Sequence, residues 1–304
     1  MEKKNTEKGV SFVRINVDNK FAGKGPKKNP INMKSGLDVF EFSPGDPGVH
    51  SLILKHLKKQ HKIKTAACAT YLNNNDYQLL TAEAPSVPDE ELIDALRWSV
   101  KDLLSIPASN ATLDTFEVPG QTSTKKSINI VSVKKEIIAS LDTLFSNEKL
   151  ALTIIDIEEL ALRNLAALDD KQKKGVVVLW LKQNYGKILF IKDNDLYLAR
   201  NINIGHQSIT SFSAGFERIA LEVQRSIDYF ERHHSQVSMN NLLVMPMEKG
   251  IGDFVSFLNS NLSISCHQFE LKTFLPGSEK LGDTEIAQHL LTFGTALRQQ
   301  DGAQ

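Results

Sequence analysis

The chain has 304 residues, of which 41% are hydrophobic and 24% are charged. This length and composition allow one large core or two smaller ones and argue against wholesale disorder. Lys and Arg together number 36, as do Asp and Glu, so no net charge draws the whole chain to nucleic acid or to anionic lipid. We therefore expect no nucleic-acid partner.

The two cysteines, Cys68 and Cys266, lie in apolar or alternating segments and not in a paired metal-binding spacing. They are typical of reduced core residues and predict a cytosolic protein. Residues 1–8 are polar and charged, and no eighteen apolar residues run together, so we expect no export signal and no membrane span. The most basic region, residues 20–64, is expected to be a solvated face, with a membrane-proximal or acidic-partner surface as the alternative.

The first half begins with two segments of strand-like composition, residues 10–17 and 37–42, separated by a connector rich in glycine, proline and lysine. A helix is predicted after the turn at residues 44–47. Its apolar residues follow helical spacing: Val49, Leu52, Ile53 and Leu57. A separate block of strands and helices comes next.

In this block, residues 66–71 and 78–81 are predicted to be strands joined as a hairpin through residues 73–76. A helix starts near Pro88, because three acidic residues follow it and suit the positive helix N-terminus. Its apolar stripe is Leu92, Leu96, Val100 and Leu103. Two more strands, residues 113–118 and 128–133, and a helix over residues 137–144 complete the order ββαββα.

The second half opens with residues 176–181, a continuous apolar run that predicts a central strand buried on both faces. Strands at residues 187–191 and 196–204 follow, connected by turns at 183–186 and 193–195. A long amphipathic helix comes after Gly205 and carries Phe212, Phe216, Ile219, Val223, Ile227 and Phe230 at steps of three and four.

The remaining elements are a strand at residues 242–245, a helix at 252–262, a strand at 264–269 and a last helix at about 285–298. The order is βββαβαβα. Three antiparallel strands followed by alternating helix and strand are typical of the ribonuclease-H-like unit. The actin, sugar-kinase and Hsp70 superfamily contains this unit twice.

Five stretches of the chain stand together in a recognisable order and spacing. They are Ala95-Leu96-Arg97-Trp98 with Ile106-Pro107, Ile155-Asp156-Ile157-Glu158 with Ala161-Leu162, Arg200-Asn201-Ile202 with Gly205, Glu222-Val223-Gln224-Arg225-Ser226 with Asp228-Tyr229-Phe230, and Gly294-Thr295-Ala296-Leu297-Arg298. In this order they resemble the type IV pilus assembly protein PilM and its relative MshI, from the biogenesis system of the mannose-sensitive haemagglutinin (MSHA) pilus. The resemblance covers roughly residues 66–298, and no single stretch is diagnostic alone.

The resemblance implies an α/β (mixed α+β) actin-like fold with two ribonuclease-H-like lobes. The first lobe would be residues 1–174, with the ββαββα block at about 65–150 as an inserted subdomain. The second lobe would be residues 175–304, and its C-terminal helix, about 285–298, would pack back toward the first lobe.

The resemblance also implies a role at the inner face of the cytoplasmic membrane. PilM-like proteins bind the short cytoplasmic N-terminal peptide of the bitopic membrane protein PilN and link it to the cytoplasmic motor ATPases. The secretion protein GspL is similar but is fused to its own membrane helix, which is not evident here. We therefore expect a cytoplasmic scaffold of the pilus assembly complex, peripheral to the inner membrane through a PilN-like partner and without direct membrane insertion.

The family fold binds ATP with two phosphate loops and an adenosine loop. A phosphate loop needs small residues, so that backbone N–H groups approach the phosphates, and a carboxylate that holds magnesium through water. At the first loop, Asn16 replaces the acid and Asp18 stands where glycine is expected. At the second loop, Trp180-Leu181-Lys182 stands where Asp-Ile-Gly is expected, so no metal-holding acid remains, and Gln183, Asn184 and Tyr185 replace small residues.

The adenosine loop, usually a run of glycines, corresponds to Pro246, Met247 and Glu248. Three altered loops together predict a degenerate nucleotide cleft, no cofactor and no enzyme activity. The alternative is a working actin-like ATP-binding protein, a nucleotide-dependent switch with Mg-ATP, in pilus assembly or type II secretion. Family members have residues near the nucleotide at the positions of Asp156, Glu222 and Arg225, although helix-end charge and surface ion pairing explain these residues equally well.

Other catalytic patterns are weak. Gly23-Lys24-Gly25 is too short for a P-loop, no G-x-S-x-G turn occurs, and His233-His234 has no partners at metal-ligand spacing, so no metal site is expected. A binding role needs only a groove or an exposed edge. We hypothesise that Trp98, Leu104 and Ile106 help to form such a groove for the peptide; the alternative is that they are core residues.

Overall fold

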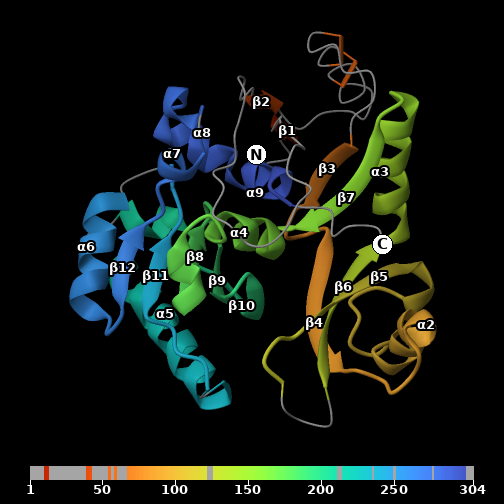
Figure 1. The fold of residues 1–304 in the computed structure, drawn as a ribbon, viewed down its shortest axis with the longest axis horizontal. Coiled ribbons are helices and arrows are strands. Elements are labelled where there is room, and N and C mark those ends of the chain that lie inside the picture. Colours follow the sequence, from red (N-terminus) through yellow and green to blue (C-terminus); the bar gives the residue numbers. More distant parts are fainter. Residues whose placement is uncertain are drawn as a thin grey trace, which may run out of the picture. The chain divides into compact units, whose positions relative to one another are not determined.

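The computed structural model describes residues 10–13, 39–42, 54–55, 58–59, 67–121, 126–210, 214–234, 236–248, 251–275 and 277–298. The chain divides into two compact units (Figure 1). The first contains residues 1–10, 42–158 and 300–304, and the second contains residues 11–41 and 159–299. Strands β1 (Val10–Val13) and β2 (Val39–Phe42) form a two-stranded sheet. Most of the helix predicted after residue 47 lies outside the described residues.

The second unit is built on a five-stranded sheet with the strand order β10-β9-β8-β11-β12. Strand β9 pairs antiparallel with both β8 and β10, and β11 pairs parallel with both β8 and β12. The strands are β8 (Val176–Leu181), β9 (Gly186–Lys192), β10 (Asp195–Ile202), β11 (Asn241–Val244) and β12 (Ser265–Gln268). The predicted ribonuclease-H-like order is confirmed.

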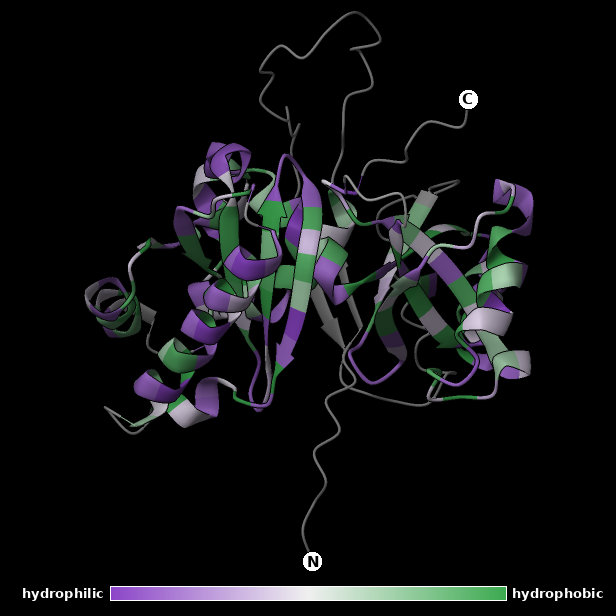
Figure 2. Cartoon of the chain, turned by 90° about the horizontal axis from the view of Figure 1, so that it is seen from below, coloured by the Kyte–Doolittle hydropathy of each residue, from purple (hydrophilic) through white to green (hydrophobic). Residues whose placement is uncertain are grey.

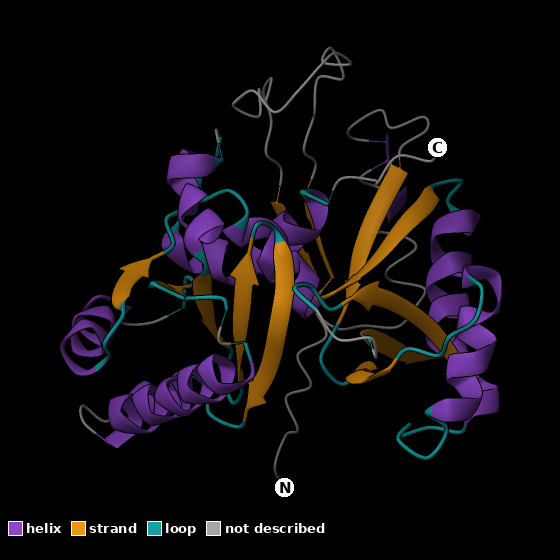
Figure 3. Cartoon of the chain, turned by 60° about the horizontal axis from the view of Figure 1, so that its bottom comes forward, coloured by secondary structure: helices purple, strands orange, loops and turns teal. Residues whose placement is uncertain are grey.

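Strand β8 is the centre of this sheet, as predicted, and all six of its side chains are buried. Val177, Leu179 and Leu181 belong to one core cluster with residues of α5 (Ala214–His233) and α6 (Ile251–Asn261). These two helices lie on the same face of the sheet (Figure 3). The central strands are mostly hydrophobic, whereas the helices carry polar residues over much of their surface (Figure 2).

Helix α4 (Glu158–Ala166) contacts the opposite face of the sheet through a buried ion pair. Ile188 and Phe190 of β9 point toward α5 and α6. Because side chains alternate along a strand, Lys187, which precedes Ile188, points to the opposite face. The Nζ of Lys187 lies 2.7 Å from Oε1 of Glu159 on α4 and 2.9 Å from Oδ1 of Asn201 on β10. Lys187 is 0% exposed, so its charge depends on these partners.

The single last helix predicted at 285–298 is wrong in detail, because the structure has two helices there. They are α8 (Asp283–Gln288) and α9 (Leu290–Ala296), and His289 between them has φ −101° and ψ 11°, outside the helical range. Only His289 interrupts the two helices, so the helical spacing of the apolar residues continues from α8 into α9. Gly294 of α9 packs on α4, because a Cβ there would lie 2.1 Å from the carbonyl oxygen of Ala161.

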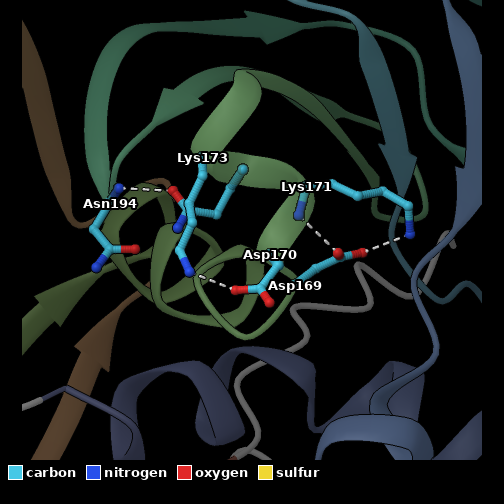
Figure 4. Close-up of polar contacts among 6 residues, drawn as sticks. Asp169, Asp170, Lys171, Lys173 and Asn194 are labelled. Atoms are coloured by element: carbon cyan, nitrogen blue, oxygen red, sulfur yellow. Dashed lines mark hydrogen bonds and ion pairs between the residues drawn. The ribbon is translucent and has the colours of Figure 1, made fainter. Parts of the chain in front are cut away.

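The turn between β9 and β10 is formed by Asp193 and Asn194, which have φ of 52° and 69°. Two residues with positive φ match the right-handed twist of a hairpin. The 3₁₀ turn η2 (Asp170–Lys174) supports this turn, because Gln172 accepts a hydrogen bond of 2.8 Å from the Asn194 N–H (Figure 4). Asp169 caps the same 3₁₀ turn and accepts hydrogen bonds of 3.0 Å from both the N–H and the Nζ of Lys171.

The first unit contains two further sheets. Strand β3 (Ala67–Leu72) pairs in parallel with β7 (Ala151–Ile157), and a three-stranded antiparallel sheet has the order β4-β6-β5. Its strands are β4 (Tyr77–Glu83), β5 (Ala111–Glu117) and β6 (Ser127–Lys134), and the helices of this unit are α2 (Asp89–Ser99) and α3 (Lys135–Asn147). The element order ββαββα is confirmed.

The predicted hairpin between β3 and β4 is wrong. The turn itself forms, with the Asp76 N–H donating to the Asn73 carbonyl at 2.8 Å, but the strands on either side belong to different sheets. Strand β4 pairs with β6 over its whole length, and β3 pairs with β7, a strand that the sequence reasoning did not assign. Turn chemistry determines where the chain bends and leaves the choice of partner strand to tertiary packing.

Helix α2 covers the three-stranded sheet with the apolar stripe that its spacing predicts. Leu96 and Val100 are buried in one cluster with Ala111 and Ile130, and Leu92 packs against it. The fourth predicted member, Leu103, does not join the stripe. It lies beyond the end of the helix and is 58% exposed.

We predict that replacement of Lys187 by Met destabilises the second unit by about 3–5 kcal/mol, because the Glu159 carboxylate then stays buried without its cation. Urea unfolding followed by circular dichroism measures the change in the free energy of unfolding. The matched control is the double variant Lys187→Met/Glu159→Leu, which removes both charges and is expected to recover most of the loss. Equal stability of the single variant and the wild type would contradict this account.

Candidate functional site

The connection between β8 and β9 is the segment that the family resemblance implies as the second phosphate loop. It is a tight turn in which the Lys182 N–H donates to the Tyr185 carbonyl at 2.8 Å. The carbonyls of Lys182 and Gln183 accept hydrogen bonds from the N–H groups of His206 and Gln207 at 2.8 and 3.1 Å. The first two residues of the 3₁₀ turn η3 (His206–Thr210) therefore hold the backbone of the loop in place.

The side chains of this loop differ in their exposure to solvent. Lys182 and Gln183 are half-buried and Asn184 is exposed. The Nζ of Lys182 lies 5.7 Å from the centre of the Trp180 ring, and Tyr185 meets the same ring edge-on at 6.1 Å. Residues 180–186 contain no carboxylate, which is the ligand that positions magnesium through water in such loops.

Gly205 follows the resemblance stretch Arg200-Asn201-Ile202, and the structure shows why a glycine stands there. A Cβ at this position would lie 2.2 Å from the Lys182 carbonyl oxygen, 2.3 Å from that of Gln183 and 2.4 Å from the Asn184 nitrogen. The loop backbone approaches the chain at Gly205 more closely than any side chain permits. The glycine and the loop therefore form one packing unit.

The segment expected at the adenosine loop follows β11. Met245, Pro246 and Met247 are all buried, and Met247 belongs to the core cluster formed with α5 and α6. The Met245 N–H donates to the Leu179 carbonyl at 2.8 Å, which continues the pairing of β11 with β8. Apolar side chains, and not a bare glycine backbone, thus occupy this turn.

The first-loop residues Asn16 and Asp18 lie outside the described residues. Asp156 is buried at the end of β7, where its Oδ1 accepts a hydrogen bond of 3.0 Å from the Ile157 N–H. Glu222 and Arg225 form an ion pair of 3.0 Å along α5. Surface ion pairing, one of the two explanations open from the sequence, is therefore present for these two residues.

Two resemblance stretches meet where β10 lies beside α5. The guanidinium of Arg200 donates a hydrogen bond of 2.9 Å to Ser226 Oγ, and that hydroxyl donates to the Glu222 carbonyl at 2.6 Å. Sequence reasoning missed this cluster and missed Arg232 nearby. The available signal was the spacing of Arg218, Arg225 and Arg232, which repeat every seven residues along one side of the helix.

The residues predicted to bind a partner lie in the first unit, at the end of α2 and in the following loop. Trp98 is 75% exposed and is therefore not a core residue, whereas Leu104 and Ile106 pack against the buried cluster beneath α2. Arg97 fixes the end of this loop, because its Nη1 donates hydrogen bonds to the Ala108 and Ala111 carbonyls at 2.8 and 2.7 Å.

A second side chain fixes the same loop. Gln78 of β4 donates to the Leu103 carbonyl at 2.9 Å and accepts from the Ser105 N–H at 2.8 Å. Leu103, with 58% of its surface exposed, is thus presented on an anchored loop. Trp98 and Leu103, called the α2 patch below, are the large exposed apolar side chains described in this unit. Leu103 is the member that the sequence prediction had placed in the core stripe.

Comparison with solved structures identifies the architecture. The chain is similar to a chain of the PilM–PilN type IV pilus biogenesis complex, with a TM-score of 0.69, 14% identity and 95% of each chain covered. The chain has an actin-like fold. No protein-family model and no curated protein matches the sequence.

Two further structures are similar at lower scores. One is the cytoplasmic domain of EpsL, an inner-membrane component of the type II secretion system of Vibrio cholerae, with a TM-score of 0.41, 8% identity, and 68% of this chain and 71% of that chain covered. The other is a Bacteroides thetaiotaomicron protein with an actin-like ATPase fold and unknown function, with a TM-score of 0.47, 10% identity, and coverage of 87% and 88%. At these scores neither adds an argument to that from the PilM–PilN structure.

Outside these segments, few of the described side chains have the chemistry of a reactive site. Burial raises the pKa of the Cys266 thiol to about 11, so it stays protonated at neutral pH. Burial is the main cause that lowers the pKa of His234, and the positive charge of the neighbouring His233 lowers it further. The His234 ring stacks on Phe230. Within the described ranges, no cluster of three metal-ligating side chains occurs and no helix is long and apolar enough to cross a membrane.

We predict that replacement of Gly205 by Ala destabilises the second unit by about 1–3 kcal/mol or more, because the added methyl group meets backbone atoms that cannot rotate away. Thermal unfolding measured by circular dichroism tests this. The matched control is Gly282→Ala, because an added Cβ at Gly282 meets nothing within 4 Å. This variant should leave the melting temperature almost unchanged. Similar melting temperatures for both variants would contradict the close packing.

Proposed function

We propose that the chain is a cytoplasmic scaffold or adaptor of a type IV pilus assembly machine of the MSHA type. It binds the cytoplasmic N-terminal peptide of a PilN-like inner-membrane protein and stays peripheral to the membrane through that partner. The observation that carries this proposal is the similarity over 95% of both chains to a structure determined as a PilM–PilN complex. The order of the five resemblance stretches supports it independently.

The α2 patch is the surface that we propose for the peptide. Exposed aromatic and aliphatic side chains on an anchored loop serve as contacts for an apolar peptide at little cost in conformational entropy. Trp98 would contact the peptide directly, and Leu104 and Ile106 would hold the loop from the core side. This divides the three residues predicted from the sequence into one contact residue and two supporting residues.

Nucleotide-independent binding is the second part of the proposal. The Lys182–Asn184 loop has no acid for magnesium, and Met247 fills the adenosine-loop turn. Both features favour a scaffold over an ATP-driven switch. The actin-like fold is the one observation that favours the switch. Chemistry by the chain itself is not part of the proposed role.

The peptide proposal is tested with the synthetic cytoplasmic N-terminus of the PilN-like protein from the same genome. The chain has two tryptophans, and Trp180 is already buried, so a blue shift of fluorescence on binding reports the burial of Trp98. We expect such a shift, and we expect Trp98→Ala to weaken binding by about ten-fold or more in calorimetry. The matched control is Leu221→Ala, which removes an apolar side chain that is 49% exposed on α5 in the second unit. Binding unaffected by Trp98→Ala would rule out the α2 patch, and no binding by the wild type would count against the partner.

The nucleotide proposal is tested by thermal unfolding with and without millimolar Mg-ATP. A ligand at a hundred times its dissociation constant stabilises the folded state by about 2.7 kcal/mol, which a melting curve detects. We expect no shift from Mg-ATP and a positive shift from the peptide, which serves as the control for sensitivity. A clear shift with Mg-ATP would establish the nucleotide switch as the better description.

A further inference from the structure

A surface pocket of about 440 Å³ lies in the second unit between β10 and α5. Its lining is Leu198, Arg200, Arg225, Tyr229 and Arg232. Three of these five side chains are arginines, although the chain as a whole has no net charge. The pocket is part of neither the altered nucleotide loops nor the α2 patch, and the proposed function does not use it.

The backbone explains why these side chains gather. Leu198 and Arg200 lie two residues apart in the regular part of β10, after the register shift between Leu196 and Leu198, so they share one face of the strand. Leu198 packs against the core cluster that includes α5, so this is the face toward α5. Arg225, Tyr229 and Arg232 follow one another at four and three residues on α5, so they share one side of the helix. Strand and helix thus contribute to the same hollow.

The pocket has an excess of positive charge. Glu222 pairs with Arg225 at 3.0 Å, and Arg200 donates to the neutral hydroxyl of Ser226. Within the described part of the chain, Arg200 and Arg232 have no carboxylate at ion-pair distance. Guanidinium groups bind carboxylates through paired N–H donors, so two of them without counterions favour an acidic ligand.

The strand that lines the pocket is at the edge of its sheet. Strand β10 pairs with β9 on one side, and no other described strand pairs with it on the other side. An edge strand offers N–H and C=O groups to an extended chain, whose side chains then alternate between the two faces of the sheet. Every second side chain of such a chain would lie on the face of Arg200 and α5.

We propose that β10 and the arginine side of α5 form a docking site for an extended acidic segment of a partner protein. The segment adds to the sheet beside β10. Acidic side chains at alternate positions, about 7 Å apart, face the guanidinium groups of Arg200, Arg225 and Arg232. Apolar side chains near them contact Leu198 and the ring of Tyr229, which is 46% exposed. A single small anion could pair with the arginines, but it would contact neither the edge of β10 nor the Tyr229 ring.

The test is a selection of short random peptides on the wild-type protein, run in parallel on the variant Arg225→Glu/Arg232→Glu. Peptides selected by the wild type alone are expected to carry Asp or Glu at alternate positions. The strongest of them is then synthesised with its acids and with Gln at the same positions. We expect the Gln peptide and the Arg232→Glu variant each to lose about ten-fold or more in affinity at low salt, and the acidic peptide to weaken as salt is raised.

The matched control variant is Arg218→Glu, which makes the same charge change at an exposed site on α5 outside the pocket lining. Compared at about 0.15 M salt, where charges more than about 8 Å apart are largely screened, its affinity for the acidic peptide should fall much less than that of Arg232→Glu, because Arg218 does not line the pocket. Equal losses for Arg218→Glu and Arg232→Glu would overturn the site in favour of a diffuse charge effect. Selection of the same peptides by both proteins, or displacement of the peptide by inorganic phosphate at similar concentration, would also overturn it.

Discussion

Burial of both faces of β8 is the constraint on which the rest of the second unit depends. Six consecutive apolar side chains, each contributing about 1.5–3 kcal/mol when removed from water, cannot be satisfied by a helix layer on one face alone. Helices α5 and α6 cover one face, and α4 contacts the other through the ion pair of Glu159 with Lys187. The strands that flank β8 are buried as a consequence, and Lys187 on the α4 face requires Glu159 as a partner.

This layered core explains why the loop residues that differ from a nucleotide-binding pattern are compatible with an intact fold. The β8–β9 turn is held by backbone hydrogen bonds from residues 206 and 207 and by close packing at Gly205. None of these contacts needs a phosphate or a metal ion. A scaffold role of the kind proposed above requires only that the fold remain rigid enough to present its surfaces.

The two candidate surfaces differ in chemistry as well as in position. The α2 patch is apolar and sits on a loop anchored by Arg97 and Gln78, which suits a peptide with apolar contacts. The β10–α5 pocket is basic and lies at a strand edge that no other described strand pairs with, which suits an acidic extended chain. A protein that connects several components needs surfaces that do not compete for the same ligand, and these two surfaces meet that condition.

The sequence by itself determined the order ββαββα in the first unit, the central place of residues 176–181 and three of the four positions of the stripe on α2, because hydrophobic periodicity reports directly which faces are buried. It also showed the missing acid near Lys182. Only the tertiary structure decided that β3 pairs with β7, that Lys187 meets Glu159 and that Arg200 joins Arg225 and Arg232. These contacts join residues distant in sequence, and no local pattern encodes which distant groups will meet once the chain has packed.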